Sequence, residues 1–364
     1  MKKTGESSNL DFLRATAVLF VGISHLGRTF HWIPVSITIL GQWGVLMFFL
    51  HTSTVLMMSL DRMAFKGWRL FASFYTRRVF RIYPLSIACI VAVLASRIPT
   101  APWELPFHRP SLRGLVSNLG LIMNFTGSPL ITVPLWSLPY EIQMYLVLPL
   151  LFLCLKAFDS VKAAIFIWLT GTILCDLALR TGSHTVFIPG VPCFLAGVVA
   201  YRMRKSVKTP KLSFSVWTAA VLAVTAVVIS PLTFHLGISW DKNHQAWSLC
   251  LLLGVLVALC KETHVPWLKQ ASHTIAKYSY GIYLTQVPVM FVAFVWLGWL
   301  PMAVRWIAFA ILAASLPVLA YHSIERPMIV FGGRLAGFGT RQQDVPQAEG
   351  YIRSFAAASS SDGN

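Results

Sequence analysis

Apolar runs of about 20 residues recur along this chain from residue 12 to residue 322, with no polar interval long enough for a separate soluble domain. A helix needs about 20 mostly apolar residues to cross the hydrocarbon of a bilayer. Only 12% of the residues are charged, whereas ordinary soluble domains are about 25% charged. The chain is therefore predicted to be an all-α integral membrane protein.

Ten segments are predicted to be transmembrane helices, although the third and the eighth are short. They span residues 12–30, 36–60, 82–97, 135–155, 163–179, 186–201, 213–232, 246–260, 278–299 and 303–322. The Pro-rich stretch 98–134 is predicted to be a surface or re-entrant segment. The tail lacks apolar periodicity. We expect one integral membrane domain at 1–335 and a disordered cytoplasmic tail at 336–364.

The distribution of positive charge predicts the orientation. If both termini are cytoplasmic, 23 of the 30 Lys and Arg residues lie on the cytoplasmic side and seven on the other. This is the positive-inside pattern, and an eleventh span would destroy it. Because this pattern accounts for most of the net charge of +17, nucleic acid is not an expected partner. The expected surroundings are a lipid bilayer.

Two ionisable residues stand out in the first span. Arg14 lies near its cytoplasmic end, and His25 follows eleven residues later. On an α-helix this spacing places both on nearly one face, about 16 Å apart along the axis. An ionisable group near mid-membrane is typical of a functional site. The alternatives are a neutral histidine bonded to a neighbouring helix and an arginine that snorkels to the membrane surface.

A basic cluster, FYTRRVFRIYP at 74–84, leads into the third span. Arg77 and Arg81 share a helical face, and Arg78 lies beside them. Guanidinium groups bind phosphate oxygens in bidentate fashion, so the cluster suits a phosphorylated ligand. Anchoring to lipid headgroups is the alternative.

Glu141 is predicted about one turn inside the outer end of the fourth span, in an otherwise apolar segment. A carboxyl group there suits proton transfer, or a structural hydrogen bond to a neighbouring helix. Asp176 and Arg180 are expected to form an ion pair. His51 is a candidate neighbour of His25, and Glu325 is expected to be exposed at the inner surface.

Six sequence elements in order resemble the acyltransferase-3 family of integral membrane acyltransferases, over residues 10 to about 330. The family opening, roughly LDGLRAxAVLxVxxxH, is similar to LDFLRATAVLFVGISH here, and its GxxGVDLFFVLSGF is similar to GQWGVLMFFLHTST at 41–54. The other four elements are FYTRRVFRIYP, WSLPYEIQMYLVLP, YSYGIYLTQVPV and SIERPMI. Among the departures, Leu46 stands where the family commonly has Asp, Ile142 replaces a second Glu, and Gln286 stands where His is common.

The resemblance implies a ten-span enzyme that transfers an acyl group, most commonly acetyl, from cytoplasmic acyl-CoA to a hydroxyl group. The family's first-span Arg and His fall on Arg14 and His25, its basic motif on Arg77, Arg78 and Arg81, and its glutamate on Glu141. The expected acceptors are a glycan, a lipid-linked sugar or a small-molecule hydroxyl.

Our functional hypothesis assigns catalysis to His25, Glu141 and Arg14, and binding of the acyl-CoA phosphates to the basic cluster. His25 acts as a general base or carries the acyl group, while Glu141 orients or recharges it. No metal is expected. Acceptor contacts are expected from the 98–134 segment, with Trp103, His108 and Asn118 as candidates. The alternative is a proton-coupled transporter that uses His25 and Glu141 as a relay.

Overall fold

The chain is all-helical over the part that the structure, a computed structural model, describes. The described residues are 7–30, 36–104, 106–180, 190–230 and 244–337. The one strand-like pairing among them is an isolated bridge between Leu212 and Cys260. Most of the predicted tail, residues 338–364, lies outside this description.

In chain order, the described helices begin with α1 and end with α14. They are α1 (Ser8–Thr29), α2 (Ser36–Arg62), α3 (Trp68–Ala95), α4 (Leu112–Leu119), α5 (Met123–Thr126), η1 (Val133–Ser137), α6 (Leu138–Phe158), α7 (Val161–Arg180), α8 (Val191–Ser206), α9 (Phe214–Ile229), α11 (His244–Leu259), α12 (Pro266–Phe291), η3 (Val292–Trp296), α13 (Met302–Ala320), η4 (Tyr321–Glu325) and α14 (Arg326–Ala336).

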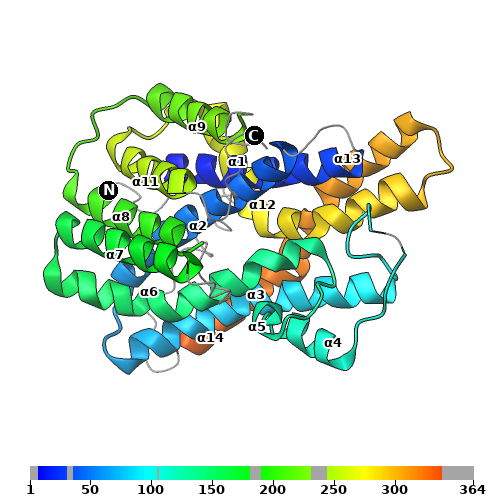
Figure 1. Ribbon diagram of the computed structural model, residues 1–364, viewed down its shortest axis with the longest axis horizontal. Coiled ribbons are helices and arrows are strands. Elements are labelled where there is room, and N and C mark those ends of the chain that lie inside the picture. Colours follow the sequence, from blue (N-terminus) through cyan, green and yellow to red (C-terminus); the bar gives the residue numbers. More distant parts are fainter. Residues whose placement is uncertain (1–6, 31–35, 105, 181–189, 231–243, 338–364) are drawn as a thin grey trace, which may run out of the picture.

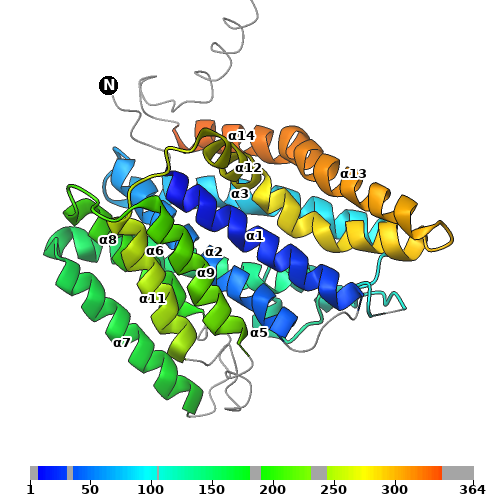
Figure 2. The same cartoon turned by 90° about the horizontal axis from the view of Figure 1, so that it is seen from above.

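Helix α1 lies in the middle of the bundle, packed against α2 and α12 (Figures 1 and 2). On one side of it, α8 packs against α2, α7 and α11. On the other side, α3 packs against α14, and α12 packs against α13. The first and the twelfth helices are thus neighbours, although about 250 residues separate them in sequence. The charged first span is therefore surrounded by other helices, and not by lipid alone.

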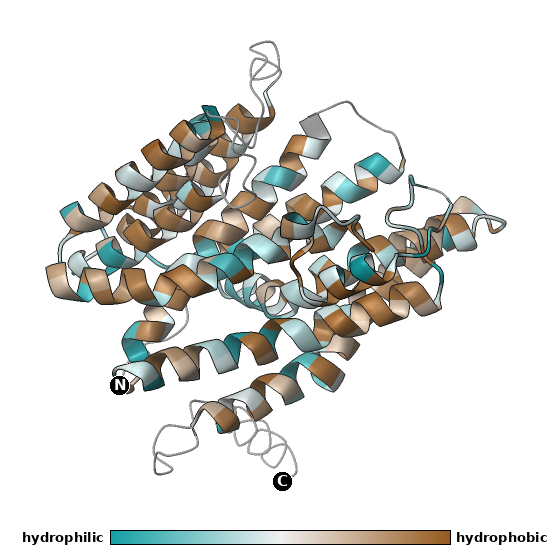
Figure 3. Ribbon diagram, turned by 60° about the horizontal axis from the view of Figure 1, so that its bottom comes forward, coloured by the Kyte–Doolittle hydropathy of each residue, from teal (hydrophilic) through white to brown (hydrophobic). Residues whose placement is uncertain are grey.

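The described helices include seven segments that are long and apolar enough to cross a membrane. These are Ser8–Thr29, Thr38–Arg62, Trp68–Ala95, Val133–Phe158, Val161–Arg180, Pro266–Trp296 and Met302–Ala336. Hydrophobic residues dominate along the helices (Figure 3). Helices α9 and α11 are apolar but have only 16 residues each. The predicted spans 186–201 and 213–232 extend beyond the described residues, so the count of ten remains a prediction for a multi-pass membrane protein.

Small residues allow α1 and α2 to approach closely. A Cβ atom at Gly41 would lie 2.5 Å from Ser24 Oγ, and one at Gly44 would lie 2.6 Å from the Ala17 carbonyl oxygen. Such small residues are typical of helix contacts in membranes, where close backbone packing replaces the hydrophobic effect. Because Gly41 lies beside Ser24 and Gly44 beside Ala17, the two helices run antiparallel.

Within the 98–134 segment, the described residues form two short helices, α4 and α5, and the first part of η1. None of these is long enough to cross a membrane, and the surface or re-entrant position of the segment remains a prediction. Asn118 holds the segment together. Its Nδ2 donates to the carbonyl oxygens of Gly114 and Pro129, both at 2.9 Å, and its Oδ1 accepts from the Ile131 amide at 3.0 Å. The segment then leads through η1 into α6, so its fixed conformation sets where α6 begins.

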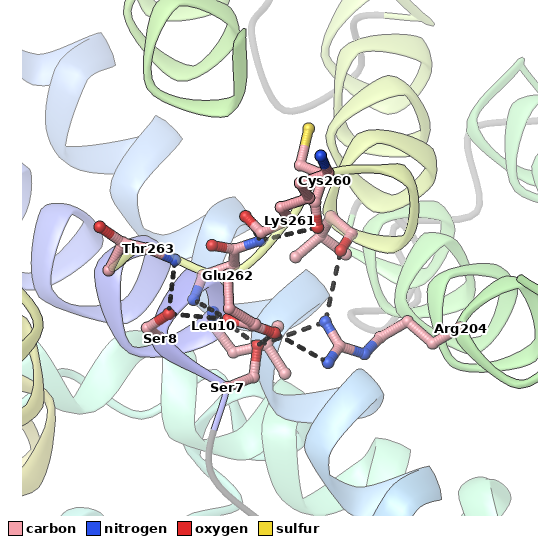
Figure 4. A network of polar contacts seen from close by, with 10 residues as sticks. Ser7, Ser8, Leu10, Arg204, Cys260, Lys261, Glu262 and Thr263 are labelled. Atoms are coloured by element: carbon pink, nitrogen blue, oxygen red, sulfur yellow. Dashed lines mark hydrogen bonds and ion pairs between the residues drawn. The ribbon is translucent and has the colours of Figure 1, made fainter. Parts of the chain in front are cut away.

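The start of α1 is fastened to the loop between α11 and α12 by the carboxylate of Glu262 (Figure 4). This carboxylate accepts hydrogen bonds from Ser7 Oγ at 2.7 Å, Ser8 Oγ at 2.8 Å and the Asn9 amide at 2.9 Å. Arg204 from α8 adds an ion pair at 3.1 Å. Partial burial acts to raise the pKa of Glu262, but these hydrogen bonds and the Arg204 charge outweigh it, and the pKa falls below its ordinary value of 4.5.

We expect Glu262→Gln to destabilise the protein by about 1–2 kcal/mol at neutral pH, because the amide retains only part of this hydrogen bonding and loses the ion pair. The lowered pKa means that the ionised contribution is complete above pH 4.5 and is lost as the pH falls through the folded-state value. In thermal unfolding in detergent, the melting temperature of the variant should therefore lie below that of the wild type, and this difference should become smaller in acid. Glu104→Gln, at an exposed residue, is the control, and an equal effect from it would contradict this role.

Candidate active site

A cavity of about 90 Å³ with both apolar and charged lining residues lies between α1, α2, α3, α6 and α12. Its polar lining residues are Arg14, His51, Thr52, Arg78, Arg81, Ser137, Glu141, Tyr145, Ser279, Tyr280 and Tyr283. Ionisable groups inside a membrane domain are costly and usually mark functional sites. The cavity is therefore the candidate active site.

Arg14 reaches the cavity from the second turn of α1. Its Nε donates a hydrogen bond to Ser279 Oγ of α12 at 2.6 Å, and Ser279 Oγ donates to the Ala276 carbonyl oxygen at 2.8 Å. The guanidinium is thus held in the protein interior by a neighbouring helix. This position disfavours the alternative in which Arg14 only snorkels to lipid headgroups.

The basic cluster is helical, since α3 runs without a break from Trp68 to Ala95. The structure and the prediction differ as to which of the arginines face the same site. Arg78 and Arg81, three residues apart, line the cavity, whereas Arg77 does not. Side chains three apart on a helix share a face just as those four apart do, and the packing of α3 selects the first pair.

The prediction for Glu325 is wrong: it is buried, with 1% of its surface exposed. Its carboxylate forms an ion pair with Arg81. Helix α14 approaches α3 so closely that a Cβ atom at Gly332 would lie 2.5 Å from Phe80 Cβ. This contact, which the local sequence of the SIERP element does not reveal, brings Glu325 against the basic cluster.

Glu141 lies in the first turn of α6 and accepts a hydrogen bond from the Tyr145 hydroxyl, one turn further along the helix. The charges of Arg14, Arg81 and Arg78 act on the same carboxyl group. The cavity thus brings Glu141 together with three of the four predicted arginines. Glu141 does not lie on the far side of His25 from the arginines, as the span order predicted, because η1 and the 98–134 segment set the start of α6 beside them.

His25 is buried, with 6% of its surface exposed, but it is not among the residues that line this cavity. Its ring lies 6.0 Å from the ring of Trp103, and the Arg28 guanidinium stacks 4.4 Å above Trp103. His25 Nδ1 has no hydrogen-bond partner among the described residues. By helical rise, His25 lies about 16 Å along α1 from Arg14.

Two predicted partners of His25 lie elsewhere. Glu141 faces the arginines, and no described hydrogen bond or ion pair joins it to His25. His51 lines the cavity, ten residues along α2 from Gly41, which lies beside Ser24. Ten residues of helix span about 15 Å, so His51 lies at the level of Arg14 and does not meet His25.

Gln286 occupies the interval between the cavity and His25. Its Oε1 lies 3.3 Å from where a Cβ atom of Gly22 would be, one helical turn before His25. Its Nε2 donates to the carbonyl oxygen of Tyr283, a cavity residue, at 3.1 Å. Gln286 is buried, and its Oε1 has no partner among the described residues. Polar groups therefore continue from the cavity towards His25.

The candidates for acceptor contacts have different surroundings. Asn118 is fully buried, and its side chain is occupied by the three backbone contacts that hold the 98–134 segment, which leaves it unsuited to bind a sugar. Trp103 is half-buried beside His25, and His108 is exposed.

The predicted ion pair between Asp176 and Arg180 on α7 is confirmed, with 2.7 Å between Arg180 Nε and Asp176 Oδ2.

Sequence reasoning missed several cavity residues. Tyr145 follows Glu141 by four residues, so their contact on α6 was detectable from spacing alone. Ser279, Tyr280 and Tyr283 stand together in YSYGIY, but the helix that they face is a tertiary property. Tyr283 shares a 2.7 Å hydrogen bond with Ser137, where η1 meets α6.

No group of three or more His, Cys, Asp or Glu side chains in the described part of the chain is placed to hold a metal ion. The described helices, seven of them long and apolar enough to cross a membrane, and the cavity that arginines, a carboxyl group and tyrosines line define a multi-pass membrane protein with a charged internal cavity. The family model described as an acyltransferase domain matches residues 7–322, so the chain belongs to the acyltransferase-3 family and is an acyltransferase. No curated protein and no solved structure matches it.

Proposed function

We propose that this acyltransferase is a transmembrane O-acyltransferase, with acyl-CoA as donor and a hydroxyl group of a glycan, a lipid-linked sugar or a small molecule as acceptor. By resemblance the acyl group is acetyl. Charge bias supports cytoplasmic termini and donor entry from the cytoplasm. By resemblance, the membrane is the inner membrane of a bacterium. The family match at 7–322 falls within the proposed 1–335 membrane domain.

The observation that carries this proposal is the charge of the cavity. Among the described residues, the carboxyl groups that act on Arg14, Arg78 and Arg81 are those of Glu141 and Glu325. An anionic ligand would balance the remaining positive charge. Phosphate oxygens suit guanidinium groups well, because they accept charge-assisted and bidentate hydrogen bonds. The donor phosphates of acyl-CoA are therefore placed here, with Arg78 and Arg81 as their principal contacts.

Catalysis is assigned to His25, which the thioester end of the donor reaches. The distance of about 16 Å between Arg14 and His25 separates a phosphate-binding end from a reacting end, and Gln286 continues the polar path between them. The His25 imidazole takes the proton of the acceptor hydroxyl while the hydroxyl oxygen attacks the thioester carbonyl carbon. Collapse of the tetrahedral intermediate releases the CoA thiolate, and the thiolate takes up the proton.

Glu141 has a revised role in this scheme. Its contacts with Tyr145 and the arginines support a part in holding the cavity cations, in place of orienting His25. Arg77, outside the cavity, is assigned to the cytoplasmic approach of the donor. The acyltransferase assignment also favours an enzyme over the proton-coupled transporter.

Purified protein in nanodiscs tests the function. We expect it to release CoA from labelled acetyl-CoA and to pass the label to a hydroxyl in a panel of sugars and small alcohols. Arg78→Ala should raise the KM for acetyl-CoA about tenfold or more, because it removes charge-assisted hydrogen bonds. Arg62→Ala, at the exposed end of α2, is the matched control. Unchanged KM in Arg78→Ala, or no thioester consumption with any acceptor, would overturn the proposal.

A further inference from the structure

One cavity residue has no part in the scheme so far. His51 lies on α2, with 4% of its surface exposed, and lines the cavity together with Arg14 and Arg81. Among the described residues that line the cavity, it is the only histidine. In the family pattern GxxGVDLFFVLSGF, the position that corresponds to His51 is leucine. The ring therefore adds an ionisable group to the part of α2 that lines the cavity.

His51 has no structural use that explains its burial. Its Nδ1 is buried without a hydrogen-bond partner among the described residues, and no described hydrogen bond involves Nε2. A buried polar group without a partner costs about 1–3 kcal/mol. By contrast, the buried Thr54 on the same helix bonds to the carbonyl oxygens of Leu50 and Gly197. A ligand in the cavity would supply the partner that His51 lacks.

The surroundings of His51 select the chemistry of that ligand. Arg14 and Arg81 act on the ring through their charges, and Arg78, Glu141, Tyr145, Tyr280 and Tyr283 complete the titratable groups of the cavity. Two neighbouring guanidinium groups repel a positive ring, so a neutral imidazole that donates one N–H is favoured. Between two cations, the best acceptor for this N–H is an anionic oxygen.

We propose that His51 is a donor-binding residue, whose ring N–H hydrogen-bonds a phosphate oxygen of the acyl-CoA held by the cavity arginines. This inference rests on the proposed function and extends it to a residue outside the family pattern. His51 then contributes to donor affinity and takes no part in the acyl-transfer step. Replacement by leucine should cost affinity but not folding, since leucine is the family residue at this position.

Binding of CoA itself, measured by titration calorimetry in nanodiscs, tests the proposal without turnover. We expect His51→Leu to weaken CoA binding about tenfold or more, and His51→Asn, which keeps an N–H donor, to recover part of the loss. His108→Leu, at an exposed histidine, should bind as wild type. At saturating acetyl-CoA, the kcat of His51→Leu should stay within about twofold of wild type.

A phosphate-free donor sharpens the test. Acetyl-pantetheine carries the same thioester without phosphates, so wild type and His51→Leu should use it with equal kcat/KM. Equal CoA affinity of the two proteins, or a lower kcat at unchanged affinity, would overturn the proposal. So would an equal loss with acetyl-pantetheine. If the wild-type protein itself binds no CoA, the proposed function fails. If the wild type binds CoA and His51→Leu binds it equally well, only the proposal for His51 fails. Should His51→Leu fold poorly, His51→Ala takes its place in the same titration. A folded His51→Ala protein that binds CoA with wild-type affinity would overturn the proposal.

Discussion

Replacing His25 by alanine is expected to lower kcat for acyl transfer by about 10² to 10⁴, the usual contribution of a general base. The affinity for CoA should change little, because His25 lies about 16 Å from Arg14 along α1 and does not line the cavity. Turnover of labelled acetyl-CoA, together with CoA titration of the same preparation, measures both quantities.

The contrast with His51 makes this prediction specific. His25→Ala should impair turnover with acetyl-CoA and with acetyl-pantetheine alike, whereas His51→Leu should impair only the phosphorylated donor. Ser24→Ala, at the buried neighbour of His25 on α1, controls for disturbance of the helix. A folded His25→Ala protein that keeps wild-type transfer would remove His25 from the reaction.

Breaking the ion pair between Arg81 and Glu325 should have the largest effect on stability. Arg81→Leu leaves the carboxyl group of Glu325, which is 1% exposed, buried without its partner. Removal of one member of a buried pair typically costs about 3–5 kcal/mol. Thermal denaturation in detergent should show this loss, and CoA binding should weaken because the cavity loses one cation.

The double variant Arg81→Leu with Glu325→Leu separates the two effects. Without either charge the buried site needs no ion pair, so we expect much of the stability to return. CoA binding should stay weak, because the cation is still missing. Recovery of binding along with stability would show that Arg81 acts only on the fold.

The helical fold was predictable because length and hydropathy decide whether a segment crosses a membrane. Each of the ten predicted ranges overlaps a described helix, but the ends differ: α3 begins at Trp68, well before the predicted start at 82, and residues 297–299 lie outside any helix. Arg14, Arg78, Arg81 and Glu141 were also identified from sequence, since charged residues in apolar segments are conspicuous. Which side chains meet was not predictable, because this depends on how separate helices pack.

Particular residues show the limit of the sequence. Arg77 and Arg78 are adjacent and chemically equal, yet the rotation of α3 places only Arg78 in the cavity. The local sequence predicts Glu325 at the surface, whereas the packing of separate helices buries it against Arg81. Span order predicts Glu141 on the far side of His25 from the arginines. It does not show where α6 begins, because the 98–134 segment decides that position.

A structure of the protein in nanodiscs with a thioether analogue of acetyl-CoA would most directly test donor binding across this cavity. We predict that its phosphates contact Arg78, Arg81 and His51, and that its reactive end lies beside the ring of His25. Two results would contradict the proposed enzyme. One is an analogue whose acetyl end stays at Arg14, about 16 Å short of His25 by helical rise, and the other is an analogue whose phosphates lie away from the cavity.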